Sequence, residues 1–313
     1  MERAPGRSPG GVGAELQRNL ESIAAIPVTP FTSSLEVDLE AYRRVLTQML
    51  TNGIDLITAN GNTSEFYSLS PAELRMLVEA TMDVCRDKAT VVVGVSFDVS
   101  TAREMARFAR DAGAAAIMVH QPVHPYRSPA GWVAYHAAIA DANPELGIIP
   151  YIRDPGITGR VIAELASGYP NFIAVKYAVP NPIAMRTALE VVEPGRLTWL
   201  CGLAELWAPF FWVAGARGFT SGLVNVDQTL PRRLLDSLRT GNWEAVWDVW
   251  NLVRPFEELR AQNGSANNVS VVKEALHRRH ICESFVRPPI TPLGNDDCAV
   301  LEEIMNSWPL AAR

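Results

Sequence analysis

One lysine lies in the middle of an apolar run in the segment NFIAVKYAVPNP, residues 171–182. Lysine and arginine together number 28, but only three of these residues are lysines: Lys88, Lys176 and Lys273. Lys88 lies in a polar turn and Lys273 in a helix-like segment, so we expect both at the surface. Lys176 has no such explanation, because its sequence neighbours are apolar.

A lysine in apolar surroundings is suited to attack a carbonyl carbon. An amine with an ordinary pKa of about 10.4 is almost entirely protonated at pH 7, and burial lowers that pKa because it disfavours the charged form. Attack gives a Schiff base, which acts as an electron sink for breaking or making an adjacent bond. Loss of water from the intermediate needs a proton donor, and the hydroxyl of Tyr151 is a candidate. The structural alternatives for Lys176 are a snorkelling side chain or an ion pair.

A glycine-containing turn, GNTSE at residues 61–65, offers further polar groups. Asn62 and Thr63 are candidates to orient the tyrosine hydroxyl, and exposed main-chain N–H groups of such a turn can bind a substrate carboxylate. Each signal is weak alone, because a turn or a tyrosine has ordinary structural uses. Together they indicate a site only if the fold brings them to one place.

Short apolar runs alternate with longer amphipathic segments from about residue 23 onward. The expected strands are 23–28, 54–59, 90–95, 115–120, 147–152, 172–177, 197–202 and 218–222. The expected helices are 38–52, 71–86, 100–112, 129–141, 158–168, 181–193, 204–214 and 228–239. Strict alternation predicts parallel βαβ units, and eight of them predict a closed (β/α)8 TIM barrel over residues 21–240. An open doubly wound sheet is the alternative, but its glycine-rich phosphate turn is missing after the first strand, where the sequence reads PVTPF.

Two further parts flank this barrel. Residues 241–313 contain three helix-like segments, which we expect to form a C-terminal helical region. Residues 1–20 contain arginines but lack the apolar core of a signal peptide, so they are expected to be a flexible N-terminal arm of a cytoplasmic protein.

Composition narrows the class of partner. The net charge is -6 and the isoelectric point is near 5.5, with no basic run longer than Arg-Arg, which argues against nucleic acid or an anionic membrane as a partner. No apolar stretch approaches the ~20 residues of a membrane-spanning helix. Four cysteines without CxxC spacing predict free thiols in a reducing compartment. A small molecule is the expected partner.

In such a barrel, reactive groups lie at the carboxyl ends of the strands. Four polar segments have that position: residues 59–66, 120–126, 150–155 and 175–178. The fold therefore predicts Lys176 and Tyr151 on neighbouring strands near one rim.

The ordered set of TPF at 29–31, GNTSE, a strand-end tyrosine in IPYIRDP and a lysine in FIAVK resembles the dihydrodipicolinate synthase / N-acetylneuraminate lyase family of class I aldolases and lyases. The resemblance covers about residues 20–310. The segments EFYSLSPAE, YIRDP and VRPPITPL look most like the keto-deoxyglucarate dehydratase branch. The resemblance implies a lyase of pyruvate or another 2-oxo acid that uses no cofactor or metal and forms a homotetramer, a dimer of dimers.

The resemblance also implies roles for single residues. Lys176 matches the Schiff-base lysine, Tyr151 the proton-transferring tyrosine, and Thr63 the hydroxyl group that contacts this tyrosine. The remaining matches to positions around the substrate are Asn62, in place of a second threonine, Gly202 and Ser221.

The chain departs from the lysine-pathway synthases of this family at two places. Those enzymes have a Tyr-Tyr pair after the fourth strand, where this chain has PVHP at 122–125, and an arginine for the second substrate, where it has Ile157. Lysine biosynthesis is therefore not the expected role. Ser64 also replaces a glycine of the motif, which restricts the turn.

Three residues are candidates to determine substrate specificity, namely His124, Tyr126 and Arg153. Arg153 is suited to hold a distal carboxylate or hydroxyl, or alternatively pairs with Asp154 or Glu65 as a structural contact. Ser64 is retained as a candidate for substrate binding within its turn.

Two other functions remain open. A metal-dependent barrel aldolase would use His120 and His124 with Asp98 or Glu65 as ligands, but no tight ligand motif is present. A non-catalytic barrel that binds a metabolite is favoured by the altered turn and the missing tyrosine pair, whereas retention of Lys176 and Tyr151 argues against it.

Overall fold

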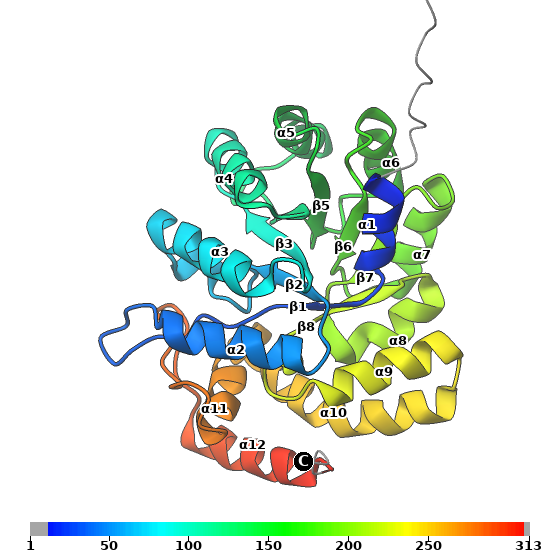
Figure 1. Cartoon of the computed structure of the whole chain (residues 1–313). Helices are drawn as coiled ribbons and strands as arrows, with labels where there is room; N and C mark the ends of the chain where they lie inside the picture. Colours follow the sequence, from blue (N-terminus) through cyan, green and yellow to red (C-terminus); the bar gives the residue numbers. More distant parts are fainter. Residues whose placement is uncertain (1–11, 310–313) are drawn as a thin grey trace, which may run out of the picture.

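The computed structural model describes residues 12–309. Eight parallel strands close into a barrel in chain order, and β8 pairs with β1 (Figure 1). The strands are β1 (Ile23–Ala25), β2 (Leu56–Ala59), β3 (Thr90–Val95), β4 (Ala116–Val119), β5 (Gly147–Ile152), β6 (Ala174–Tyr177), β7 (Thr198–Cys201) and β8 (Gly218–Ser221). The predicted (β/α)8 TIM barrel is confirmed. The first strand is shorter than predicted, because Pro27 has no N–H to donate to a neighbouring strand.

A helix follows each strand and packs on the outside of the barrel. These helices are α2 (Leu39–Thr51), α3 (Pro71–Cys85), α4 (Val99–Ala112), α5 (Pro129–Ala142), α6 (Gly159–Gly168), α7 (Pro182–Val191), α8 (Ala204–Ala214) and α9 (Thr229–Thr240). Two short 3-10 helices, η1 (Phe66–Ser68) and η2 (Leu223–Asn225), follow β2 and β8. As its sequence predicts, Ser70 caps α3: its hydroxyl accepts from the Glu73 N–H at 3.3 Å, and the Glu73 carboxylate accepts from the Ser70 N–H at 2.8 Å.

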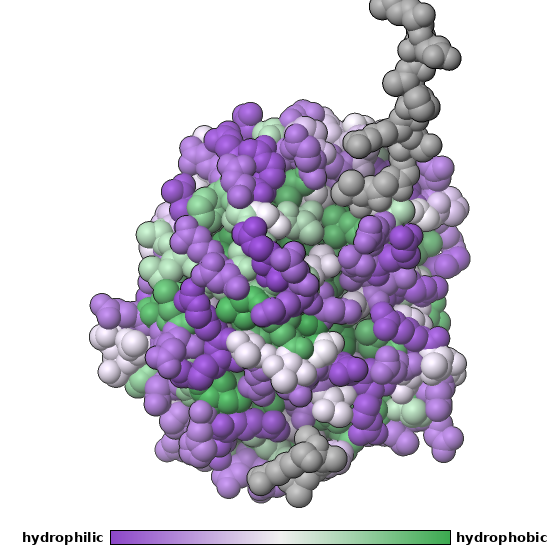
Figure 2. All heavy atoms as spheres, viewed as in Figure 1, coloured by the Kyte–Doolittle hydropathy of each residue, from purple (hydrophilic) through white to green (hydrophobic). Residues whose placement is uncertain are grey.

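The apolar core has two parts. One fills the layer between the strands and the surrounding helices, and the other fills the inside of the barrel with side chains such as Leu56, Val92 and Met118. Viewed from the side that carries α1, the surface is mostly hydrophilic over the outer helices, and apolar residues show between them (Figure 2). Among residues 12–309 no helix combines the length and apolar character that crossing a membrane requires.

The expected flexible arm is wrong over residues 12–20, which form helix α1 (Val12–Leu20). Leu16 and Leu20 are buried against the inside of the barrel, at the end opposite the carboxyl ends of the strands. The Gln17 amide donates to the carbonyl oxygens of Ile173 and Arg196 at 3.0 and 2.9 Å. The spacing of Leu16 and Leu20 was the missed signal, since residues four apart share one helix face. Residues 1–11 of the expected arm lie outside the described residues.

The C-terminal region contains three helices that lie together on one side of the barrel (Figure 1). They are α10 (Trp243–Ser265), α11 (Ser270–Arg278) and α12 (Asn295–Ser307). Helix α10 packs against α8 and α9, and α11 lies against η2. This region therefore lies against the helices that follow β7 and β8.

Lys273 contradicts the expected surface position. It is completely buried in α11, forms an ion pair with Glu65 of the GNTSE turn, and donates to the carbonyl oxygen of Phe285 at 2.7 Å. The missed signal was its place three residues before Leu276 and four after Val269, on the apolar face of the helix.

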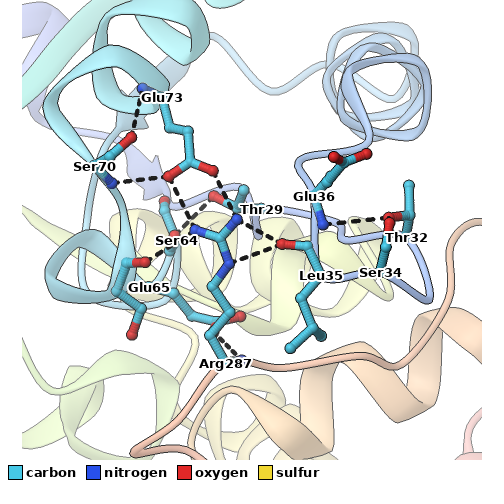
Figure 3. Close-up of polar contacts among 11 residues, drawn as sticks. Thr29, Thr32, Ser34, Leu35, Glu36, Ser64, Glu65, Ser70, Glu73 and Arg287 are labelled. Atoms are coloured by element: carbon cyan, nitrogen blue, oxygen red, sulfur yellow. Dashed lines mark hydrogen bonds and ion pairs between the residues drawn. The ribbon is translucent and has the colours of Figure 1, made fainter.

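Arg287 fastens the same turn to the C-terminal region (Figure 3). Its main-chain N–H donates to the Glu65 carboxylate at 3.0 Å. Its guanidinium makes two hydrogen bonds to Glu73, at 2.6 and 2.9 Å, and two to the carbonyl oxygen of Leu35. The turn that contributes Asn62 and Thr63 is thus held by residues more than 200 positions away.

We predict that Lys273→Met lowers the free energy of unfolding by about 3–5 kcal/mol, because it leaves the buried Glu65 carboxylate without its cation. Urea unfolding at matched protein concentrations measures this change. Lys88→Met, at the exposed lysine, should change stability by less than about 0.5 kcal/mol. Adding Glu65→Gln to Lys273→Met should recover part of the loss, and equal stability of Lys273→Met and wild type would contradict the ion pair.

Candidate active site

Lys176 and Tyr151 meet at the carboxyl ends of neighbouring strands. They are register partners in the pairing of β5 with β6. The Lys176 ammonium nitrogen lies 4.0 Å from the centre of the Tyr151 ring, and both side chains are buried. The predicted placement of this pair at one rim therefore agrees with the structure.

The surroundings of Lys176 favour its neutral form. Burial is the main reason that its pKa falls from 10.5 to about 7, the nearby cation of Arg153 lowers it further, and Cys201 acts in the opposite direction. Burial raises the pKa of the Tyr151 hydroxyl, so this group stays protonated at neutral pH. The site therefore presents an amine that can attack and a phenol that can donate a proton.

The turn at 61–65 approaches the same pair. The Asn62 amide nitrogen lies 3.5 Å from the Tyr151 hydroxyl. Thr63 is buried beside it and lines the same cavity, but within residues 12–309 its side chain makes no hydrogen bond to Tyr151. The contact that the resemblance implied for Thr63 is therefore made by Asn62.

A cavity of about 410 Å³ opens at this rim. The barrel contributes Asn62, Thr63, Tyr151 and Lys176 to its wall. The main-chain N–H groups of Asn62 and Thr63 have no acceptor among the described residues, whereas the next two N–H groups are bonded inside the turn. These two donors suit an anion.

Gly202 lines the cavity directly beside the lysine, as expected. A Cβ atom at this position would lie 2.8 Å from the Ala178 methyl group and 3.0 Å from Cγ of Lys176. A glycine is therefore required here for the lysine side chain to keep its place.

Arg153 is exposed at the mouth of the cavity. Neither structural pairing considered from the sequence is present, because Asp154 pairs with Arg127 at 3.4 Å and Glu65 pairs with Lys273. Within the described residues no carboxylate pairs with the Arg153 guanidinium, which leaves a cation facing the cavity entrance.

Two predicted substrate-binding serines are placed elsewhere. The Ser64 hydroxyl donates to the carbonyl oxygen of Pro27 at 2.6 Å and accepts from the Gly61 N–H, and it does not line the cavity. The Ser221 hydroxyl is bound to Glu205 and accepts from the Val224 N–H at 3.0 Å. Both hydroxyls are used in holding the main chain, and neither residue lines the cavity, so a substrate contact by Ser64 or Ser221 stays a prediction.

His124 is exposed on the loop after β4 and does not line the cavity. Its Nδ1 is hydrogen-bonded to the main chain of Tyr126, so this ring nitrogen is used within the loop. Tyr126 is likewise exposed.

The metal ligands considered from the sequence do not converge. His120 is buried inside the barrel and bound to the carbonyl oxygen of Asn60, Asp98 caps helix α4, and Glu65 is paired with Lys273. Across residues 12–309 no group of three potential ligands has the geometry to hold a metal ion.

The opposite wall of the cavity comes from the C-terminal region, which the sequence reasoning did not include. Glu257 and Arg260 of α10 form a buried ion pair, in which one guanidinium nitrogen lies 2.7 and 2.9 Å from the two carboxylate oxygens. The other terminal nitrogen of Arg260 donates to Asn268. The only sequence signal was the spacing of two charged residues on the apolar face of α10, beside Val253 and Phe256. The direction of that face depends on how α10 packs on the barrel.

Comparisons with known proteins identify relatives of this chain in sequence and in fold. The model of the "Dihydrodipicolinate synthetase family" matches residues 19–307. A "Probable 5-dehydro-4-deoxyglucarate dehydratase" of Rhizobium rhizogenes is 30% identical over 302 residues, which is 94% of this chain and 97% of that protein. The crystal structures of dihydrodipicolinate synthase from Oceanobacillus iheyensis and Bacillus clausii superpose with TM-scores of 0.91 at 38% and 39% identity, covering 94% of this chain and 98% and 99% of theirs.

We predict that one lysine side chain loses its proton with a midpoint near pH 7, because burial and Arg153 disfavour its charged form. Since the chain has three lysines, ¹³Cε-lysine NMR over pH 5–10 resolves them, and the shifting resonance should disappear in Lys176→Arg. Below the midpoint the amine is cationic and unreactive, and above it the amine is free. If the resonance lost in Lys176→Arg does not titrate below pH 9, the described environment of Lys176 is incorrect.

Proposed function

The chain belongs to the dihydrodipicolinate synthetase family, and from that membership we propose that it is a Schiff-base-forming lyase of the class I aldolase type that acts on a 2-oxo acid. One observation carries this proposal: the Lys176 amine is held in a dry barrel mouth beside Tyr151, with a pKa near neutrality. Family membership alone does not identify the reacting group, whereas this arrangement supplies it.

The chemistry begins with the neutral amine of Lys176. It attacks carbon 2 of the oxo acid, and the carbinolamine loses its oxygen as water after Tyr151 donates a proton, which gives the imine. The imine makes a proton on carbon 3 acidic. In a dehydratase the Tyr151 phenolate takes this proton, and the resulting enamine expels the hydroxyl group of carbon 4, which takes up the same proton and leaves as water. In an aldolase the protonated imine instead accepts the electrons of the bond between carbons 3 and 4, which breaks as the hydroxyl group of carbon 4 loses its proton, and the enamine so formed is then protonated on carbon 3. Hydrolysis of the imine then releases Lys176.

The carboxylate next to the oxo group is placed by the turn. We assign it to the free N–H groups of Asn62 and Thr63, because they lie in the cavity wall close to Tyr151. Preorganised main-chain donors of this kind are at full strength only where water is excluded, as at this buried turn. Asn62 then has a second task, since its amide side chain approaches the Tyr151 hydroxyl.

Dehydration of a sugar-derived oxo acid fits the chain better than the lysine-pathway reaction. Ile157, at the place of the synthases' substrate-binding arginine, is buried in the outer core, and the loop that replaces the tyrosine pair places His124 outside the cavity. Several relatives that match over most of the chain carry the name 5-dehydro-4-deoxyglucarate dehydratase. The two similar crystal structures carry the name dihydrodipicolinate synthase, but this chain lacks the residues that the second substrate of that reaction needs.

A substrate with a second carboxylate matches the entrance of the cavity. Arg153 is the unpaired cation there, and Glu257 and Asn268 on the opposite wall offer hydrogen-bonding groups for the hydroxyls of such a substrate. We therefore assign the distal carboxylate of a hydroxylated 2-oxo diacid, such as 5-dehydro-4-deoxyglucarate, to Arg153.

The assembly and location are also proposals. We propose a homotetramer, which is supported by exposed apolar side chains on α7, α8 and α10, namely Ile183, Phe210, Val213, Trp243 and Trp247. We further propose a cytoplasmic location, in keeping with the free cysteines.

We predict that pyruvate with sodium borohydride inactivates the protein and adds one reduced pyruvate to Lys176, because hydride traps the imine. Peptide mass spectrometry locates the adduct. Lys176→Arg should form no adduct and lose activity by on the order of 10³-fold or more, since an effective nucleophile is removed.

Lys88→Arg is the matched control and should trap pyruvate like the wild type. The absence of an adduct with pyruvate and a panel of 2-oxo acids would refute the Schiff-base proposal. A wild-type protein that forms no adduct, with unchanged ligand binding in Lys176→Ala, would favour the non-catalytic barrel.

We predict that Arg153→Met raises KM for a hydroxylated 2-oxo diacid about 10- to 100-fold, because a charge-assisted contact to the distal carboxylate is lost. Steady-state kinetics with the diacid measure this change. Pyruvate has no distal carboxylate, so its trapping by borohydride should change little at a pH well above the midpoint of Lys176, where loss of the Arg153 charge alters the protonation of the lysine least. Arg127→Met, on the neighbouring loop outside the cavity, is the control, and an equal effect of both variants would contradict the assignment.

A further inference from the structure

His120 is a buried histidine that the chemistry above does not use. It follows β4, its main-chain N–H donates to the carbonyl oxygen of Val95, and its side chain has no exposed surface. Its Nε2 lies 2.9 Å from the carbonyl oxygen of Asn60, just before the turn that approaches Tyr151.

The hydrogen bond determines the tautomer of this histidine. A carbonyl oxygen can only accept, so Nε2 carries the proton and Nδ1 does not. Nδ1 has no partner among the described residues, and burial lowers the pKa of the imidazole to about 3 despite the bond to Asn60. A positive charge on Lys176 also lowers the pKa of His120. His120 is therefore a fixed neutral donor.

Asn60 is held in an unusual conformation at the point where this donor acts. Its φ is 57°, in the left-handed region that non-glycine residues seldom adopt. Gly94 makes the contact possible, because a Cβ there would lie 2.0 Å from the Asn60 carbonyl oxygen and 2.7 Å from Nε2 of His120. The Asn60 side chain donates to the carbonyl oxygen of Leu74 at 3.1 Å, so the residue is fixed from two sides.

The ring of His120 also contacts the aromatic side chains around the site. It stacks on Phe66 with ring centres 4.4 Å apart, and it meets the Tyr151 ring edge-on at 6.2 Å. Phe66 follows the turn directly, and Tyr151 is the proposed proton donor. One side chain thus touches Tyr151 and the two residues that flank the turn, Asn60 and Phe66.

We propose that His120 is a positioning residue: by donating from Nε2 to the Asn60 carbonyl oxygen, it sets the place of Asn62 and Thr63 relative to Tyr151 and Lys176. The inference rests on the proposed function, because it concerns the same reaction. His120 exchanges no proton with the substrate and does not line the cavity. Its effect is on the rate of imine formation, since small displacements of reacting groups cost rate more than affinity.

Histidine NMR of the unmodified protein tests the premise. In ¹⁵N-histidine-labelled protein, His120 should be an Nε2–H tautomer that does not titrate between pH 5 and 9, with its signals assigned by loss in His120→Gln. His136 is an internal control, because its Nδ1 faces the Trp132 carbonyl oxygen at 2.8 Å and it should show the opposite tautomer. A His120 that titrates in this range, or that is protonated on Nδ1, would overturn the proposal.

Two variants separate the hydrogen bond from the packing. His120→Gln keeps an N–H donor without the ring, and His120→Phe keeps a ring without the donor. We expect His120→Phe to lower kcat and the rate of pyruvate imine formation about 10- to 100-fold, with KM within about threefold of wild type. His120→Gln should stay within about fivefold of wild type in both rates. Circular dichroism at the assay temperature ensures that folded protein is compared.

The results distinguish this inference from the function on which it rests. If the wild type forms no pyruvate adduct, the proposed function fails and the positioning role fails with it. If the wild type forms the adduct and His120→Phe matches it in rate, only the role of His120 is refuted. Equal losses in His120→Phe and His120→Gln would also refute it, because packing and not the donor would then be the cause.

Discussion

The burial of one amine is the constraint on which the rest of the site depends. Keeping Lys176 neutral near pH 7 requires a dry environment, and the barrel supplies it by surrounding the lysine with strands on all sides and closing its far end with Leu16 and Leu20 of α1. The arrangement has a cost for folding. The folded protein binds the proton of the Lys176 ammonium group more weakly than the unfolded chain does. Below pH 7 the lysine therefore opposes folding by about 5 kcal/mol. The stability of the protein rises as the pH increases from 7 toward the ordinary lysine pKa. A site of this kind therefore needs a large core around it.

The turn at 61–65 is the second element that must be held precisely enough for chemistry, and it is fixed from three directions. Ser64 binds it to the segment after β1, Glu65 binds it to Lys273 and Arg287 of the C-terminal region, and Asn60 binds it to β4 through His120. Charged and polar groups are used for this purpose although burying them is costly. Their directionality is the reason, since apolar packing alone would leave the orientation of the turn poorly determined. The C-terminal region thus belongs to the site in two ways: it fixes the turn and it forms the far wall of the cavity.

Most of the barrel could be predicted from the sequence because its signals are local. Apolar runs of strand length, amphipathic helices and caps such as Ser70 each act within a few residues, and their strict alternation leaves few folds to consider. The same locality limits the reasoning at the ends of the chain. The first helix was missed because Leu16 and Leu20 are too few to indicate burial without the barrel beneath them. Lys273 was expected at the surface because a charged residue is usually exposed, although it lies on an apolar helix face. Its ion-pair partner Glu65 is more than 200 residues away, so the sequence around Lys273 does not indicate that the charge is paired.

Within the site, the sequence alone determined the reactive pair and the turn. A lysine and a tyrosine at the ends of successive strands of a parallel barrel must lie side by side, because main-chain hydrogen bonds fix the register of the strands. It did not determine which hydroxyls and charges face the cavity. Ser64 and Ser221 turn to the main chain, Arg153 is left unpaired, and Glu257 and Arg260 enter the wall from a helix outside the barrel. Only the tertiary structure decided these, because the direction of a side chain depends on the partners that other segments bring to it, and those partners are far away in the sequence.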